Sequence, residues 1–290
     1  MSVVEPGRFE EFVKHIDGNT YTFSYEGVCV VIYICDGNRA VLIDSGYEEH
    51  GEMIGEFLAE QGLSLAGIIH SHIHIDHYSG NEMLLQSEAA GRHVPIYIPT
   101  FEHPYVEIEE TEFFDFANAD VEAYEGREEI RVGGATFKII DCYGHSSDSK
   151  ILITPDGVAY LGDALMCGDM MTRARMPYAY DLVADIKAKM SLRELEYEKY
   201  VCSHCGDFAA AELEGVVEAN LKIMARALEY AKKTEAKCPG MENMQKARRM
   251  LKYMGLPQFV DTDWVVNTVV QYFEDRDEIE KLLGDIGQIE

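Results

Sequence analysis

The stretch that most constrains this chain is residues 68–81, IIHSHIHIDHYSGN, in which metal-binding side chains follow an apolar run. In an extended segment, residues two apart point the same way, so His72 and His74 can share one ion. Asp76 and His77 follow in a turn and can point elsewhere, so two metals side by side fit the pattern better than one. Imidazole and carboxylate ligands suit zinc, and also iron or manganese where more oxygen ligands join.

Four further metal-binding side chains stand where predicted strands end. Asp44 follows the β-rich run 40–43, His145 follows 136–142, Asp163 follows 158–162 and His204 follows 199–202. From its position alone, Asp44 is either a helix N-cap or a turn residue at the end of a strand. The other three are candidate ligands just past a strand.

This ordered set resembles the metallo-β-lactamase superfamily, whose motifs are an Asp after an early strand, H-x-H-x-D-H, a Gly-His, a Gly-Asp and a final Gly-His-Gly-like turn. The resemblance extends over roughly residues 20–210. It implies that His72, His74 and His145 hold a first metal, that Asp76, His77 and His204 hold a second, and that Asp163 bridges them. Asp44 then lies behind the ligands and fixes their loop.

The resemblance also implies a chemistry. A water between two cations roughly 3.5–4 Å apart loses a proton near neutral pH and becomes a hydroxide nucleophile. We expect Asp76 to orient this hydroxide and to move its proton. Ligands from the protein leave positions open for water and substrate, which is typical of a catalytic rather than a structural site.

The family's fold is a four-layer αβ/βα sandwich, and the strand pattern agrees with it. An antiparallel meander is predicted from Phe9 to Asp44, and two hairpins lie within 129–162. A helix is expected to begin near Ser79 or Asn81 and to end at Gly91.

We expect two domains in this α/β chain. The catalytic domain comprises residues 1–208, with an acidic, aromatic-rich insertion over the sheet at about 101–129. A helical extension follows at 209–290, where Ala209–Lys233, Met241–Met254 and Trp264–Leu283 have helical spacing. The extension is a candidate for packing, for forming a homo-oligomer or for holding part of a substrate.

Five side chains are candidates for contacting the substrate. Tyr78 directly follows a ligand and either narrows the pocket or packs in the core. In relatives, the connection after the Gly-Asp motif borders the active site. It is therefore expected to supply groups that grip an anion or assist an oxyanion, namely Arg173, Arg175, Tyr178 and Tyr180.

Charge and cysteine usage narrow the partners. The 25 Lys and Arg residues against 52 Asp and Glu give a formal net charge of −27, which repels phosphate backbones and argues against a nucleic-acid substrate. Seven scattered cysteines predict reduced thiols, with Cys202 and Cys205 forming a C-x-x-C pattern around His204. With neither a leader-like segment nor a membrane span in the sequence, we expect a cytoplasmic protein.

The preferred function is a binuclear metallohydrolase, most simply with two zinc ions, acting on a small ester, thioester, lactone or amide. The glyoxalase II, lactonase and ribonuclease Z groups share this ligand set. A persulfide dioxygenase with a single iron is the main alternative, and a phosphodiesterase acting on small molecules is another. A binding protein on an inactive scaffold is disfavoured, because all seven ligand positions are filled.

Overall fold

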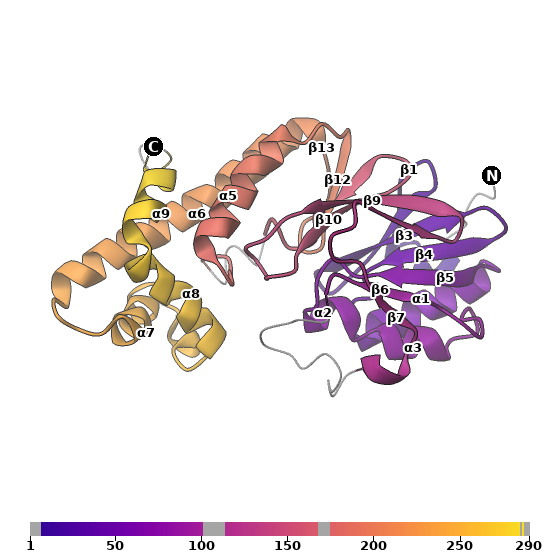
Figure 1. Ribbon diagram of the computed structural model, residues 1–290, viewed down its shortest axis with the longest axis horizontal. Coiled ribbons are helices and arrows are strands. Elements are labelled where there is room, and N and C mark those ends of the chain that lie inside the picture. Colours follow the sequence, from indigo (N-terminus) through magenta and orange to yellow (C-terminus); the bar gives the residue numbers. More distant parts are fainter. Residues whose placement is uncertain (1–6, 101–113, 168–174, 285, 287–290) are drawn as a thin grey trace. The chain divides into compact units, whose positions relative to one another are not determined.

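The computed structural model describes residues 7–100, 114–167, 175–284 and 286, and these form two compact units (Figure 1). The first unit draws on Met1–Asp141, Asp148–Gly162 and Tyr197–Ala210 and holds both β-sheets. The second draws on Cys142–Ser147, Asp163–Glu196 and Ala211–Glu290 and is helical.

The first sheet has seven strands in sequence order. They are β1 (Val13–Asp17), β2 (Thr20–Tyr25), β3 (Val28–Cys35), β4 (Arg39–Ile43), β5 (Ser64–Ile69), β6 (Ile96–Ile98) and β7 (Val121–Ala123). The first four strands pair antiparallel, as the meander pattern predicts, and the pairs from β4 to β7 are parallel.

The second sheet has six strands and is also mixed. They are β8 (Glu129–Val132), β9 (Ala135–Asp141), β10 (Lys150–Ile153), β11 (Val158–Tyr160), β12 (Lys199–Cys202) and β13 (Gly206–Ala209). Only the β11–β12 pair is parallel among these strands, because residues 161–198 separate the two and return the chain in the same direction.

Strand β3 shows how the first unit is packed, because all eight of its side chains are buried. Its even-numbered residues, such as Val30 and Ile32, join a core that includes Ile54 and Phe57 of helix α1. Its odd-numbered residues join a second core with residues of the other sheet, such as Phe137. A strand alternates its side chains between its two faces, so β3 packs against helices on one side and against the second sheet on the other.

The helices of the first unit connect the parallel strands and carry part of the loop of candidate ligands, residues 70–77, which we call the ligand loop. They are α1 (Glu48–Glu60), α2 (Ile75–Tyr78) and α3 (Asn81–Gln86), with 3-10 turns at Gly7–Phe9 (η1) and Phe116–Asn118 (η3). The expected helix from Asn81 to Gly91 is therefore too long at its C-terminal end. Ser87 is extended there, and its hydroxyl donates to the carbonyl of Leu84.

The acidic segment 101–129 is only partly as expected. Residues 101–113 lie outside the described part of the chain. Within the remainder, residues 121–123 belong to the sheet itself, because β7 pairs parallel with β6. Tyr124, which follows β7, is fully buried and donates its hydroxyl to the carbonyl of His70 at 2.7 Å. Part of this segment therefore supports the ligand loop.

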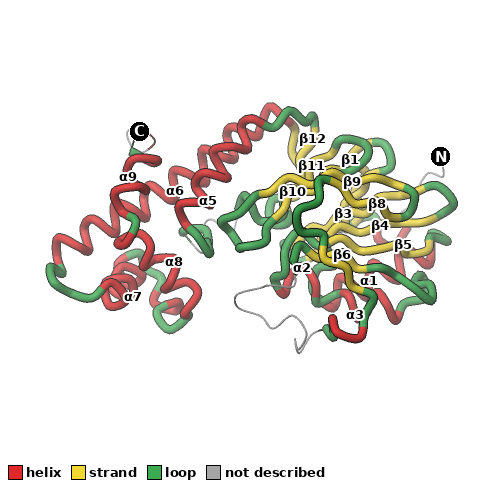
Figure 2. The backbone as a smooth tube through the Cα atoms, viewed as in Figure 1, coloured by secondary structure: helices red, strands yellow, loops and turns green. Residues whose placement is uncertain are grey.

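The second unit contains the helices labelled α5 to α9, which are drawn in red in Figure 2. They are α5 (Leu182–Ser191), α6 (Ala210–Lys237), α7 (Asn243–Tyr253), α8 (Asp263–Glu274) and α9 (Arg276–Leu283), with 3-10 turns at Leu192–Glu194 (η4) and Pro257–Phe259 (η5). The last predicted helix is two helices, because the chain leaves helical geometry at Asp275.

Two mixed sheets with flanking helices and a helical C-terminal extension confirm the predicted fold class. In the described part of the chain, none of the helices combines the length and the apolarity needed to cross a bilayer.

The backbone of helix α1 packs directly against the backbone at the end of the ligand loop. A Cβ at Gly51 of α1 would lie 2.1 Å from the carbonyl oxygen of Gly80, which follows the H-x-H-x-D-H residues. We therefore expect Gly51→Ala to lower the free energy of unfolding by more than about 2 kcal/mol, since a rigid backbone must move. Gly215→Ala in α6 is the matched control, because nothing lies within 4 Å of its Cβ. It is expected to stabilise the chain by up to about 1 kcal/mol in the same urea titration. Equal effects of the two changes would contradict this account of the α1 contact.

Candidate metal centre

The candidate ligands gather because parallel strands end together. In the β4–β5 pair Ile43 lies opposite Ile69, and the next residues, Asp44 and His70, are likewise neighbours. The backbone N–H of Asp44 donates to Ile69 O at 2.9 Å. In the second sheet, β11 and β12 are paired in the same sense, and the N–H of Ser203 donates to Gly162 O at 3.1 Å. The residues that follow each strand are therefore brought to one edge of their sheet.

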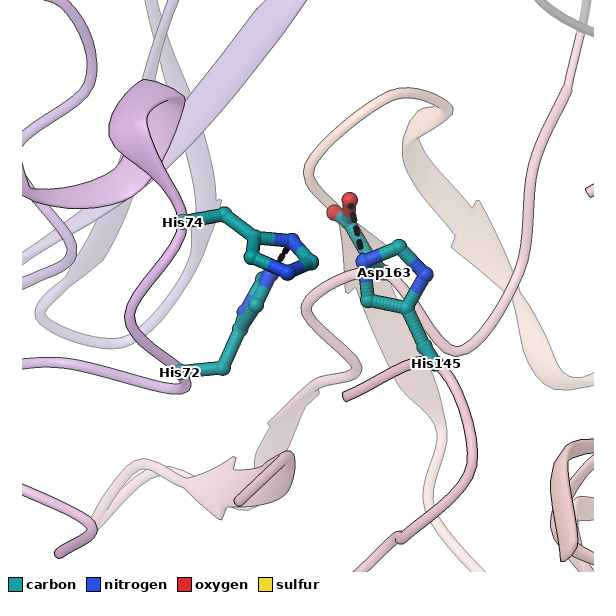
Figure 3. Close-up of side chains that lie close together, drawn as sticks. All are labelled: His72, His74, His145 and Asp163. Carbon is teal, nitrogen blue, oxygen red and sulfur yellow. Dashed lines mark hydrogen bonds and ion pairs between the residues drawn. The ribbon is translucent and has the colours of Figure 1, made fainter. Parts of the chain in front are cut away.

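Two overlapping groups of metal-binding atoms result. Within each group the donor atoms all lie within 4.8 Å of one another, and the groups are His72, His74, His145 and Asp163, and Asp76, His77, Asp163 and His204. Figure 3 shows the first group. All seven predicted ligands are thus members of one group or the other, and Asp163 belongs to both.

Hydrogen bonds fix the proton on Nδ1 of two imidazoles of the H-x-H-x-D-H loop. His77 Nδ1 lies 2.7 Å from Asp44 Oδ2, which can only accept. His72 Nδ1 lies 3.1 Å from Ser71 Oγ, whose own proton is directed to Asp44 at 2.7 Å. The Nε2 atoms of both rings therefore carry a lone pair that can bind a metal.

The same arrangement recurs at the two ligands from the second sheet's loops. His145 Nδ1 donates to Tyr178 O at 3.2 Å, and His204 Nδ1 donates to Gly27 O at 3.0 Å. Their Nε2 atoms face carboxylates, Asp163 Oδ2 at 3.3 Å and Asp76 Oδ2 at 3.2 Å respectively. A fixed acceptor behind each ring is the usual support of a metal-binding histidine, so these residues fit a metal.

Asp44 accepts hydrogen bonds from the loop of candidate ligands. The side chain is fully buried, and its carboxylate accepts from Ser71 N–H, Ser71 Oγ, His77 Nδ1 and Tyr160 OH, each at 2.7 Å. Burial by itself would raise the pKa of this carboxyl. The neighbouring His77 and His70 outweigh the effect of burial and hold the pKa below its usual range. Asp44 is no helix cap. It adopts a φ of 62°, a conformation that non-glycine residues seldom take outside special sites.

His70 and Asn81 are two supporting residues that the sequence pattern did not distinguish. Asn81 Nδ2 donates to His70 Nε2 at 3.0 Å, which leaves the proton of this imidazole on Nδ1. His70 Nδ1 faces Asp44 Oδ1 at 3.5 Å, and His70, Asn81 and Asp44 are all fully buried. In the sequence His70 looks like another metal ligand. Its contacts with Asn81 and Asp44 in the structure indicate a supporting role instead.

The residues predicted to contact the substrate differ in their surroundings. Tyr78 is buried at 4% exposure and packs against Phe116 in the core, which favours its packing role. Arg173 lies outside the described residues. Arg175 is exposed and its guanidinium donates to Met254 O at 2.6 Å.

Tyr178 and Tyr180 are closely associated with His145. The ring of Tyr178 meets the His145 ring edge-on at a centroid distance of 5.5 Å, and Tyr180 donates its N–H to the carbonyls of Gly144 and His145. Trp264 of α8 packs edge-on against Tyr178 at 4.8 Å and remains 50% exposed. Nothing in the sequence distinguishes Trp264 beyond its being the single tryptophan.

The prediction of reduced thiols is wrong for two residues. Cys167 and Cys205 are disulfide-bonded, whereas Cys202, the other member of the C-x-x-C pattern, is a buried thiol outside any disulfide. The Cys202 thiol donates to Gly162 O at 3.1 Å. Each bonded cysteine follows a candidate ligand, Asp163 or His204, in a different part of the chain, so the sequence spacing gave no sign of a disulfide.

Comparisons with known proteins find chains similar to this one. The family model described as the metallo-beta-lactamase superfamily matches residues 24–204. A hydroxyacylglutathione hydrolase from Shewanella pealeana is 28% identical over 197 residues, which are 64% of this chain and 63% of that protein. The chain thus spans less than two thirds of that relative's length.

Two solved structures resemble most of the chain. A beta-lactamase domain protein from Burkholderia ambifaria is 14% identical, with 91% of this chain and 88% of that one covered and a TM-score of 0.63. A metallo-beta-lactamase family protein from Thermus thermophilus is 15% identical, with 89% and 94% covered and a TM-score of 0.60. At such identities the likeness concerns the fold alone.

Proposed function

Because the chain belongs to the metallo-beta-lactamase superfamily, we propose that it is a binuclear metal-dependent hydrolase acting on a small ester, thioester, lactone or amide. The observation that carries the proposal is the pair of donor groups that share Asp163. A carboxylate has two oxygens and can serve two cations at once, whereas a single-metal site needs only one of the groups.

The donor chemistry supports two zinc ions, and it also suits iron or manganese. His72, His74 and His145 would hold one cation, Asp76, His77 and His204 the other, and Asp163 both. Bound there, the cations would polarise the scissile carbonyl and lower the pKa of water toward 7.

Asp76 is the residue that we assign to proton transfer. Its carboxylate faces His204 Nε2 at 3.2 Å and His77 Nε2 at 3.8 Å, and its side chain is 16% exposed. A carboxylate at the edge of the donor set can orient a water through one oxygen and accept its proton. The protonated form can then donate to the leaving group.

The substrate class follows from charge, from exposed rings and from the curated relative. A formal charge of −27 disfavours nucleic acid. Trp264 and Tyr180 expose aromatic surface in the unit that holds His145, which supports an apolar group on the substrate. The relative's name, hydroxyacylglutathione hydrolase, supports a thioester as the first substrate to test.

The proposal is tested by metal analysis and turnover on the same sample. Protein purified without added metal is analysed for zinc, iron and manganese and assayed on a panel of thioesters, lactones, amides and phosphodiesters. We expect about two zinc or manganese ions per chain, hydrolysis of one carbonyl class, and loss of activity and of thermal stability with a chelator. A single iron with oxygen consumption on a persulfide would instead favour the persulfide dioxygenase. Turnover confined to phosphodiesters would favour a phosphodiesterase that acts on small molecules.

A further inference from the structure

Helix α8 of the C-terminal extension contacts a short segment that in turn contacts the candidate ligand His145. We propose that Thr268 and Gln271 of α8 are positioning residues for His145. The inference rests on the proposed function only in taking His145 to be a metal ligand.

The segment 178–182 holds the His145 loop on one side. Tyr178 O accepts the Nδ1 proton of His145 at 3.2 Å. The N–H of Tyr180 donates to Gly144 O at 2.8 Å, and the N–H of Asp181 donates to the same carbonyl at 3.0 Å. The orientation of the His145 ring therefore depends on where this segment places one backbone carbonyl.

Two side chains of α8 hold the same segment from the other side. Thr268 Oγ1 accepts from the N–H of Ala179 at 3.3 Å and lies 2.9 Å from Ala179 O, to which it can donate. Gln271 Nε2 donates to Tyr180 O at 3.1 Å, and Gln271 Oε1 accepts from Leu182 N–H at 2.7 Å. In each of the peptide groups 178–179, 179–180 and 180–181, the carbonyl and the N–H thus bond to opposite sides, one to the His145 loop and the other to α8.

The His145 loop is also packed against α5, so it cannot follow the segment 178–182 if that segment loses its hydrogen bonds to α8. A Cβ at Gly144 would lie 2.2 Å from the backbone of Asp185 in α5, so the loop is already seated against that helix. Thr268 is fully buried, and its hydroxyl also lies 3.1 Å from Trp264 O one turn earlier. A threonine that merely satisfied its own helix would need only that last contact. The two contacts with Ala179 are the reason to infer that Thr268 holds the segment 178–182.

Matched variants separate positioning from packing. Thr268→Val keeps the shape and removes the hydroxyl, Thr268→Ser keeps the hydroxyl, and Asn267→Ala changes an exposed neighbour on the same helix. The zinc affinity of each metal-free protein is measured by competition with a chromophoric chelator, and amide hydrogen exchange is followed at residues 178–182.

We expect Thr268→Val to weaken one of the zinc equivalents by about tenfold, the usual size for a residue that supports a ligand, and to speed exchange in the segment. Adding Gln271→Leu should increase the loss, whereas Thr268→Ser and Asn267→Ala should bind zinc as the parent protein does. Wild-type zinc affinity in a folded Thr268→Val protein would overturn the inference, and so would equal losses in the Val and Ser variants. Zinc affinity is read without substrate, so an inactive substrate panel would count against the proposed function and leave this result standing.

Discussion

Asp163→Ala is expected to abolish hydrolysis and to reduce the metal content to less than two ions per chain. Asp163 is the residue common to both donor groups, and it is 5% exposed. Removing it takes an anionic donor from both positions and leaves His145 Nε2 without the carboxylate at 3.3 Å. The loss of turnover should exceed about a hundredfold, since removal of one preorganised stabilising group costs roughly 10²–10³ in kcat.

The measurement pairs elemental analysis with kcat on the best substrate of the panel. Asp163→Asn tests the charge at nearly constant volume and should fail almost as completely, because an amide oxygen is a poorer ligand and carries no charge. Asp277→Asn removes one negative charge from a side chain that is 90% exposed and should leave kcat unchanged. Two bound ions and wild-type turnover in Asp163→Ala would remove Asp163 from the site.

Asp44→Asn is expected to weaken both the fold and the metal centre, although Asp44 belongs to neither donor group. Asn tolerates a positive φ, so the backbone at 62° is preserved and the change isolates the charge. The amide offers a donor where His77, Ser71 and Tyr160 all require an acceptor. We expect the free energy of unfolding of the metal-free protein to fall by about 3 kcal/mol or more, as when one partner of a buried charged pair is removed.

Graded variants and two readouts make the Asp44 prediction specific. Tyr160→Phe removes one of the donors and should cost only about 1 kcal/mol. Zinc affinity should fall about 10–100-fold in Asp44→Asn, because His77 loses the acceptor that fixes its tautomer. Urea titrations of the metal-free proteins give the stability, and chelator competition gives the affinity. Equal stability in Asp44→Asn and Tyr160→Phe would show that the carboxylate charge is not what holds the loop.

The sequence was most informative where function depends on local spacing. H-x-H-x-D-H places His72 and His74 on one side of an extended segment and Asp76 and His77 in the following turn, and the structure assigns the two pairs to different donor groups. Strand ends were readable from apolar runs that stop at polar residues. Boundaries set by tertiary packing were less readable, as for α3, which ends at Gln86, and for the helix that divides at Asp275.

The sequence was least informative where a residue's partners are distant in the chain. Tyr78 stands beside a ligand in the sequence but points into the core against Phe116. Cys202 and Cys205 are close in sequence, yet Cys205 is disulfide-bonded and Cys202 is not. Neighbours along a chain point in different directions in a helical turn and at the end of a strand, so sequence proximity there predicts little about contact.

The sequence by itself determined the family, the fold class and the candidate ligands, because metal chemistry restricts both the residue types and their order after the strands. Only the tertiary structure decided what holds those ligands. The four hydrogen bonds to Asp44, the pairing of Asn81 with His70, and the contacts of Thr268 and Gln271 with residues 179–182 join positions that are 11 to 116 residues apart. Such contacts are created by the register of parallel strands and the docking of helices, and no local spacing encodes them.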